Sequence, residues 1–235
     1  MAQPTQEQLK NLIELYQSNK LDEAETEAQN LLQQFPEDLT CLNILGVILD
    51  GKGNTEEALK IYDRALQINE NSAETHFNKG SILHRIGNSN EARICYEKAI
   101  AIKSDFLNAY FNLGLVCQNL QSYEKAIENY QKAIELKPDF HEAIGAMGTA
   151  YQNQGELDEA IEYYKKALSI QSDARNHFNL AAGLRNKGSL DEAIEQFEKS
   201  LSFNENNPEA LDGVPSDETI VMSSVEDIDL SLIHI

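Results

Sequence analysis

The chain has 235 residues, with 39 acidic against 19 basic side chains, and a formal net charge of −20 at pH 7. Such an acidic surface repels phosphate backbones and anionic lipid, which argues against nucleic-acid and membrane partners and favours a basic or neutral peptide. The N-terminus is polar, and no run approaches the roughly 18 apolar residues of a transmembrane helix, so the sequence predicts a cytoplasmic protein.

The first predicted helices lie between Thr5 and Pro36. Thr5 and Gln8 have the spacing of a capping box, so we expect a helix to begin there. A polar turn over residues 17–20 separates it from a second helix, which begins near Leu21 and stops at Pro36. The outer face of this pair is polar, which suits a solubilising N-terminal cap.

A pair of apolar helical stripes joined by a short turn then recurs along the chain. We call the residues at one position of successive pairs a column, and three columns largely keep their residue type. The column on the first helix holds Leu12, Gly46, Gly80, Gly114, Gly148 and Ala181. The second helix has a column of alanines, Ala24, Ala58, Ala92, Ala126, Ala160 and Ala193, and an aromatic column, Tyr62, Tyr96, Tyr130, Tyr164 and Phe197. Glycine inside a helix costs about 1 kcal/mol relative to alanine. Its return in one column indicates that the paired helices approach closely, with the aromatic side chain filling the space toward the next pair.

The columns and their spacing, 34 residues four times and 33 once, resemble the tetratricopeptide repeat, a family of helix-turn-helix solenoids. The resemblance implies an all-α, right-handed superhelical solenoid of about six repeats over residues 5–206. The repeats would start near residues 5, 39, 73, 107, 141 and 174. Residues 1–4 would be an N-terminal extension, and residues 207–213 an aborted seventh repeat. Residues 214–235 form an acidic tail, which we interpret either as disordered or as a truncation or cloning scar.

No constellation in the sequence supports catalysis, a metal or a cofactor. The five histidines do not converge at ligand spacing, and we expect His76 and His177, which share a column, to have packing roles. The three cysteines have no CxxC spacing and are expected to be small core residues. The glycine-rich turn at residues 51–54 follows a helix and lacks the GxxxxGK[ST] spacing of a phosphate loop, so we expect an inter-helix turn where positive φ is useful.

In the tetratricopeptide family the first helices line a concave groove for extended peptides or partner helices. The resemblance therefore implies a peptide-binding groove made of Phe77, Asn78, Arg85, Phe111, Asn112, Gln118, Asn119, Gln152, Asn153, Phe178, Asn179 and Arg185. Arg175 falls on the same side, but these arginines do not match the two-lysine clamp that some chaperone-binding members use for an acidic C-terminus.

Asn78, Asn112 and Asn179 share one column, similar to the repeat region of O-linked N-acetylglucosamine transferases. An asparagine can donate to a peptide carbonyl and accept from its N–H group, so the column would hold an extended backbone. The alternative is that these asparagines cap or pack locally.

The sequence thus predicts a non-enzymatic scaffold or adaptor that binds a protein or peptide. One alternative is the N-terminal repeat region of a truncated larger enzyme, such as a glycosyltransferase, sulfotransferase or methyltransferase. Another is self-association through an uncapped C-terminal repeat, whose apolar edge around Ile194, Phe197 and Leu201 we expect to be partly exposed.

Overall fold

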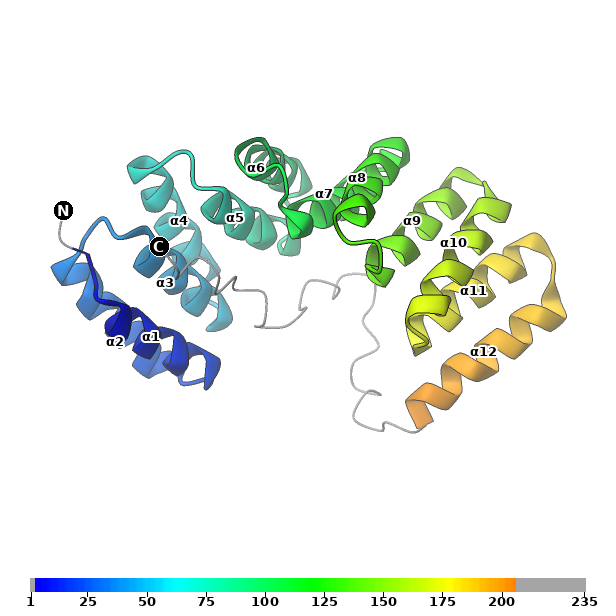
Figure 1. Cartoon of the computed structure of the whole chain (residues 1–235), viewed down its shortest axis with the longest axis horizontal. Helices are drawn as coiled ribbons and strands as arrows, with labels where there is room; N and C mark the ends of the chain where they lie inside the picture. The colour runs from blue at the N-terminus through cyan, green and yellow to red at the C-terminus, as the bar shows by residue number, and fades with distance from the viewer. Residues whose placement is uncertain (1–2, 206–235) are drawn as a thin grey trace. The chain divides into compact units, whose positions relative to one another are not determined.

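The computed structural model describes residues 3–205, which form twelve α-helices with no strand among them. The predicted all-α class is therefore confirmed. The described residues fall into two compact units, which we call the N-terminal block (residues 3–104) and the C-terminal block (residues 105–205). The blocks are coloured blue to cyan-green and green to orange in Figure 1. The expected seventh repeat at 207–213 and the tail at 214–235 lie outside the described residues.

The N-terminal block consists of three helical hairpins. Its helices are α1 (Gln6–Gln17), α2 (Leu21–Gln34), α3 (Leu39–Gly51), α4 (Thr55–Ile68), α5 (Ala73–Arg85) and α6 (Ser89–Ile102). Each helix packs on its hairpin partner, and α2 and α4 also pack on the first helix of the next hairpin. The predicted capping box is confirmed, because Thr5 Oγ1 accepts from the Gln8 backbone N–H (3.2 Å) and Gln8 Oε1 accepts from the Thr5 N–H (2.9 Å).

The C-terminal block repeats the same arrangement. Its helices are α7 (Leu107–Asn119), α8 (Tyr123–Leu136), α9 (His141–Gln154), α10 (Leu157–Ile170), α11 (Ala174–Lys187) and α12 (Leu190–Glu205). Helices α8 and α10 each pack between the first helix of their own hairpin and that of the next, whereas α12 packs on α11.

The first helices of consecutive hairpins contact each other directly within each block. Helix α3 contacts α1 and α5, and α9 contacts α7 and α11, whereas the second helices make no comparably close contacts with one another among the described residues. The first helices therefore form the inner layer of each block. We call the surface of this layer the first-helix face.

The glycine column is buried, as predicted, but its nearest neighbours are tyrosine rings rather than the alanine column. A Cβ atom added to Gly46 would lie 2.5 Å from Cε1 of Tyr62, and one added to Gly148 would lie 2.8 Å from Cδ1 of Tyr164. The added Cβ at Gly148 would also lie 3.1 Å from the backbone oxygen of Ala160, so the two backbones are close as well. Each glycine thus leaves room for the aromatic ring of its own repeat.

The turns between paired helices share one backbone conformation. Gly53, Gly87, Gly155 and Gly188 all have positive φ, as expected for this turn. The same place in the first and fourth hairpins is taken by Asn19 (φ 56°) and Gln121 (φ 57°), which the sequence did not single out. The turn geometry is therefore imposed by the hairpin even where no glycine is present.

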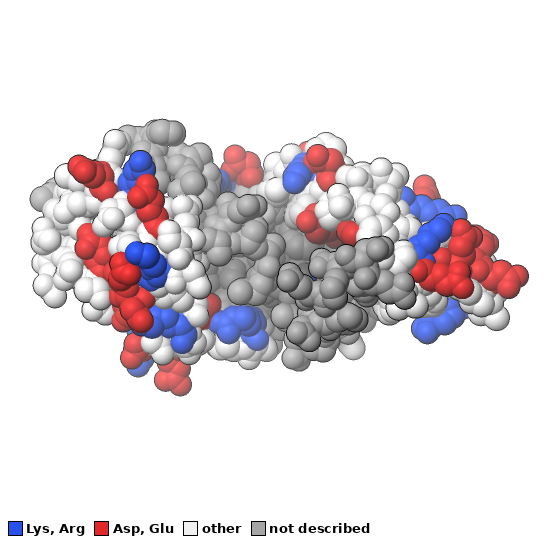
Figure 2. Space-filling model, turned by 90° about the horizontal axis from the view of Figure 1, so that it is seen from below, with Lys and Arg blue, Asp and Glu red and all other residues white. Residues whose placement is uncertain are grey.

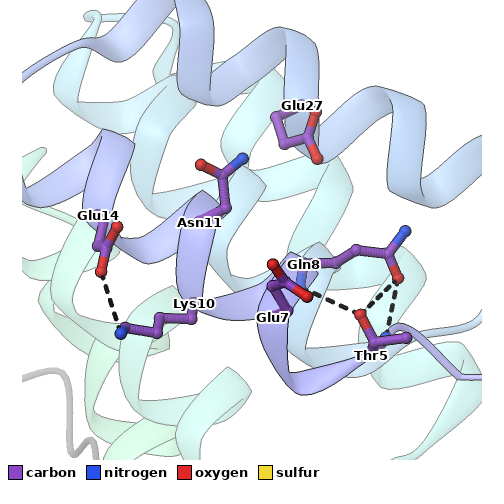
Figure 3. A pocket seen from close by; sticks show the side chains of 7 residues that line it. All are labelled: Thr5, Glu7, Gln8, Lys10, Asn11, Glu14 and Glu27. Atoms are coloured by element: carbon purple, nitrogen blue, oxygen red, sulfur yellow. Dashed lines mark hydrogen bonds and ion pairs between the residues drawn. The ribbon is translucent and has the colours of Figure 1, made fainter.

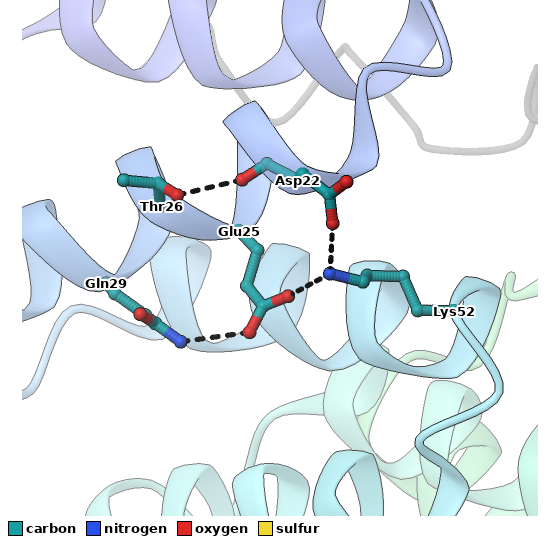
Figure 4. Close-up of polar contacts among 5 residues, drawn as sticks. All are labelled: Asp22, Glu25, Thr26, Gln29 and Lys52. Carbon is teal, nitrogen blue, oxygen red and sulfur yellow. Dashed lines mark hydrogen bonds and ion pairs between the residues drawn. The ribbon is translucent and has the colours of Figure 1, made fainter.

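Polar contacts also link neighbouring hairpins. Lys52, at the end of α3, reaches Asp22 (Nζ–Oδ1 2.5 Å) and Glu25 (Nζ–Oε2 2.6 Å) on α2 (Figure 4). The hydrogen bond from Lys52 lowers the pKa of Asp22. In the C-terminal block, Lys187 on α11 pairs with Asp158 on α10 in the equivalent way.

The two ends of the described chain differ in polarity. The surface of α1 carries a shallow polar pocket, which is lined by Thr5, Glu7, Gln8, Lys10, Asn11 and Glu14, together with Glu27 from α2 (Figure 3). By contrast, Ile194 and Leu201 on α12 are 56% and 60% exposed, which confirms the expected apolar edge. Phe197 is only partly buried and packs edge-to-face on Phe178, with ring centroids 5.6 Å apart.

Candidate functional site

All twelve residues predicted to form the groove lie on first helices, or at their ends. Helix α5 provides Phe77, Asn78 and Arg85; α7 provides Phe111, Asn112, Gln118 and Asn119; α9 provides Gln152 and Asn153; and α11 provides Phe178, Asn179 and Arg185. The N-terminal block thus holds three of these residues and the C-terminal block the other nine. A column that runs from Asn78 to Asn112 would span both blocks and stays a prediction.

The three column asparagines are half-buried and have unused hydrogen-bonding groups. The side chains of Asn78, Asn112 and Asn179 form no hydrogen bond with any residue that the structure describes. Asn129 on α8 behaves differently, because its Nδ2 donates to the backbone oxygen of Lys125 at 2.7 Å. Local capping, one alternative role, would require such a bond. Local packing and ligand binding are both compatible with these unbonded amides, so the groove stays a prediction.

Both glutamines of the predicted groove contact buried tyrosines. The Tyr130 hydroxyl donates to Oε1 of Gln118 (3.3 Å), and the single proton of the Tyr164 hydroxyl is shared between Oγ1 of Thr149 (3.2 Å) and Oε1 of Gln152 (3.4 Å). Burial raises the pKa of both tyrosines, so the hydroxyls stay protonated donors. With Oε1 engaged, the Nε2 donors of each amide remain for a partner. The sequence signal for this pairing is a tyrosine twelve residues after each glutamine.

The aromatic residues of the first-helix face are exposed to different degrees. Phe77 lies 5.7 Å from Tyr96 between ring centroids, and Phe111 lies 5.0 Å from Phe140, so both rings pack within their own block. Phe178 is 54% exposed although it contacts Phe197. Its ring therefore offers the largest apolar contact among these three aromatic residues.

The charged residues of the face are mostly paired within the protein. Arg85 on α5 forms an ion pair with Asp50 on α3, which the sequence did not reveal, so its charge is neutralised in place. Lys79, on the same helix, reaches Asp63 at 2.5 Å. Arg185 is exposed and forms no ion pair with a described residue. Figure 2 shows how acidic side chains (red) gather on the surface with basic ones (blue) set among them.

Two histidines, His76 and His177, form hydrogen bonds within the protein. His76 lies on α5 with Nε2 2.9 Å from the backbone oxygen of Glu70, and burial lowers its pKa. His177 lies between Ser172 (Nε2–Oγ 3.0 Å) and Gln196 (Nδ1–Oε1 2.8 Å), so both histidines have the packing role that the sequence predicts. No group of three metal-ligating side chains occurs within residues 3–205. None of the helices described there is long and apolar enough to cross a bilayer.

Comparison with known families gives three matches of one kind. Models of the tetratricopeptide repeat match residues 107–140 and residues 139–206, and a TPR repeat model matches residues 51–87 and 80–121. Together they cover residues 51–206, about two thirds of the chain. No curated protein matches the chain.

Among solved structures, the crystal structure of MamA is similar with 29% sequence identity and a TM-score of 0.66, over 70% of this chain and 97% of MamA. The structure of PilF from Pseudomonas aeruginosa matches 87% of this chain and 92% of its own, with a TM-score of 0.73 and 18% identity. YrrB, described as a TPR protein with an unusual peptide-binding site, matches 79% of this chain and 96% of its own, with a TM-score of 0.64 and 23% identity. At such identities PilF and YrrB show likeness of fold alone.

Proposed function

The chain belongs to the tetratricopeptide repeat family, and we propose that its first-helix face binds an extended peptide segment of a partner protein. The family match and the solved relatives support a protein-interaction scaffold. The finer proposal is that binding is non-catalytic and that the chain acts as an adaptor. This finer proposal is argued from the residues of this chain and does not transfer the peptide-binding site described for YrrB.

The observation that carries the proposal is the set of unengaged amides on first helices. Asn78, Asn112 and Asn179 are half-buried and make no side-chain hydrogen bond within the described residues. Each amide offers two donors and an acceptor, which match the carbonyl and N–H groups of an extended peptide. Each such hydrogen bond replaces one to water and contributes a net free energy of about 0.5–1.5 kcal/mol to binding.

The glutamines add pre-oriented donors to this surface. Tyr130 and Tyr164 contact Oε1 of Gln118 and Gln152 at 3.3 and 3.4 Å, and these contacts bias the direction of the remaining amide donors before a ligand arrives. Fixing a side chain in advance lowers the ordering cost of binding. A peptide that crosses α7 and α9 would meet both donors.

Selection followed by affinity measurement tests the proposal. Random peptides of about a dozen residues are displayed and selected against the full chain, and the Kd of each selected peptide is measured by fluorescence anisotropy. The triple variant Asn78→Ala, Asn112→Ala, Asn179→Ala should bind them about tenfold or more weakly, because each lost hydrogen bond contributes on the order of 1 kcal/mol. Its far-UV circular dichroism should match that of the unaltered chain.

The matched control replaces three asparagines on second helices, Asn30, Asn90 and Asn129, with alanine. This variant should keep the affinity of the unaltered chain. Selected peptides that bind the first-helix variant and the control variant equally well would show that the face is not the binding surface. Failure to select any peptide would also count against the proposal.

A further inference from the structure

Four of the six lysines and arginines on the described first helices are paired with acidic side chains. Lys10 contacts Glu14, Lys79 contacts Asp63, Arg85 contacts Asp50, and Lys187 contacts Asp158. The exceptions are Arg175 and Arg185, which lie on one helix, α11, and form no hydrogen bond or ion pair with any residue that the structure describes. Lysines on second helices, such as Lys60 and Lys125, also form no ion pair with a described residue, so the two arginines are distinguished by their place on the first-helix face.

The two arginines belong to a single stripe of α11. Arg175, Phe178, Ala182 and Arg185 follow the i, i+3, i+7, i+10 spacing of one helix face, and Asn179 lies beside them. The core contacts of α11 come from the opposite side, where Leu180 and Leu184 are each only 4% exposed. We call the outward residues Arg175, Phe178, Asn179, Ala182 and Arg185 the α11 stripe. Its ends are cationic, and its middle holds the apolar side chains of Phe178 and Ala182 beside the amide of Asn179.

The neighbouring acidic groups do not neutralise the stripe. Glu142 on α9 holds the position equivalent to Arg175 in the preceding repeat, but its carboxylate contacts His141 Nε2 at 3.3 Å. Asp173, which precedes α11, accepts from the backbone N–H of Asn176 at 2.8 Å as the helix cap. Arg175 also lies in the first turn of α11, where the helix dipole disfavours a cation. A bound anion would offset the unfavourable interaction between Arg175 and the helix dipole.

From this stripe we infer that the C-terminal block binds an acidic peptide segment in which two carboxylates flank an apolar side chain. The inference rests on the proposed function and names the chemistry of the ligand for one part of the first-helix face. Each guanidinium would donate to one carboxylate, the apolar side chain would cover the exposed ring of Phe178, and Asn179 would engage the peptide backbone.

The net charge of the chain does not oppose this ligand at short range. A net charge of −20 favours basic partners at long range, as the sequence alone suggests. At physiological ionic strength, however, exposed charges more than about 8 Å apart are largely screened. The contacts at α11 are therefore decided by the two arginines, whose charged hydrogen bonds to carboxylates are among the stronger polar contacts in proteins.

The spacing of the arginines sets the length of the ligand. Arg175 and Arg185 are ten residues apart on α11, which corresponds to about 15 Å along the helix axis. An extended peptide rises about 3.3 Å per residue, so its two carboxylates should be four or five residues apart. A fluorescein-labelled peptide containing Asp-Leu-Ser-Ser-Asp meets this requirement, and one containing Asn-Leu-Ser-Ser-Asn is its uncharged control.

Fluorescence anisotropy with the full chain tests the inference. The Asp peptide should bind more tightly than the Asn peptide, and its affinity should fall as NaCl is raised. Arg175→Gln and Arg185→Gln should each weaken it by about tenfold, the loss expected for one charged hydrogen bond. Arg185→Lys, which keeps the charge but not the planar donor pair, should retain part of the affinity.

The matched control is Arg93→Gln, which removes the same charge from α6, where Arg93 pairs with Glu97 at 2.8 Å. It should leave the affinity for the Asp peptide within about twofold, as expected for an ion pair that lies on a second helix and not on the first-helix face. Equal binding by the Arg93, Arg175 and Arg185 variants, or equal binding of the Asp and Asn peptides, would overturn the inference. If library peptides depend on the asparagine column but not on these arginines, the proposed function stands and the inference fails; if the chain binds no peptide at all, both fail.

Discussion

Replacing Gly148 with alanine would test the close packing on which each repeat depends. Gly148 lies on α9 beneath the ring of Tyr164, which is 1% exposed. The added methyl group would lie 2.8 Å from two ring carbons and 3.1 Å from the backbone oxygen of Ala160. Neither neighbour is the free end of a flexible side chain, so the helices must separate or the ring must shift.

Two opposing effects determine the magnitude. Overpacking a closed core costs about 1–3 kcal/mol, and the two contacts at Gly148 favour the upper part of that range. Alanine inside a helix gains about 1 kcal/mol over glycine. We therefore expect Gly148→Ala to lower the free energy of unfolding by about 2 kcal/mol. A shifted Tyr164 ring would also disturb Gln152, to which its hydroxyl is bonded.

Urea unfolding followed by far-UV circular dichroism measures this change as a lower midpoint. The control is Gly51→Ala at the end of α3, where the added methyl group would lie 3.8 Å from Cδ1 of Leu21, an ordinary contact. That variant should be as stable as the unaltered chain or up to about 1 kcal/mol more stable. Combining Gly148→Ala with Tyr164→Leu should reduce the cost of the added methyl group. Stabilisation by Gly148→Ala, comparable to that by Gly51→Ala, would refute the packing argument.

Three further changes have defined outcomes. Ala126→Leu, at a position with 0% exposure on α8, should destabilise the fold by about 1–3 kcal/mol in urea unfolding, and unchanged stability would mean that the helix contact is loose. Gln121→Gly should raise the free energy of unfolding by about 0.5–1 kcal/mol, because it removes the cost of positive φ, and a lower urea midpoint would contradict that reasoning. Burial lowers the pKa of His76 below its usual 6.5, so its neutral form stabilises the fold above that pH, and this stability is lost as the pH falls through 6.5. His76→Gln should therefore reduce the pH dependence of unfolding between about pH 7 and pH 5, and an unchanged dependence would show that His76 does not contribute.

The helices and their pairing were predictable because the same local contacts return in every repeat. The return of glycine and tyrosine in fixed columns, as at Gly46 and Tyr62, reflects a packing requirement that is met within one hairpin. The turn residues were predictable for the same reason where glycine is present. Gln121 was missed because glutamine has no preference for positive φ, and only the surrounding hairpin imposes it.

The polar contacts of the first-helix face were less predictable. The ion pair of Arg85 with Asp50 joins two hairpins, so it depends on how consecutive helices stack and on the rotamers of both side chains. The support of Gln118 by Tyr130 also depends on geometry that periodicity does not encode, since the same sequence position is histidine at His84. The repeat periodicity predicts that these residues lie on one face, but their hydrogen-bond and ion-pair partners depend on the three-dimensional packing of the helices.

The most direct test of the proposed peptide face is NMR observation of its side-chain amides. The Nδ2 resonances of Asn78, Asn112 and Asn179 are followed as a selected peptide is titrated to saturation, with Asn129, which is bonded to the Lys125 carbonyl, as the internal reference. We expect the three column amides to shift in proportion to bound peptide while Asn129 does not. A peptide that saturates the chain and leaves all three column resonances unmoved would contradict the assignment of this face.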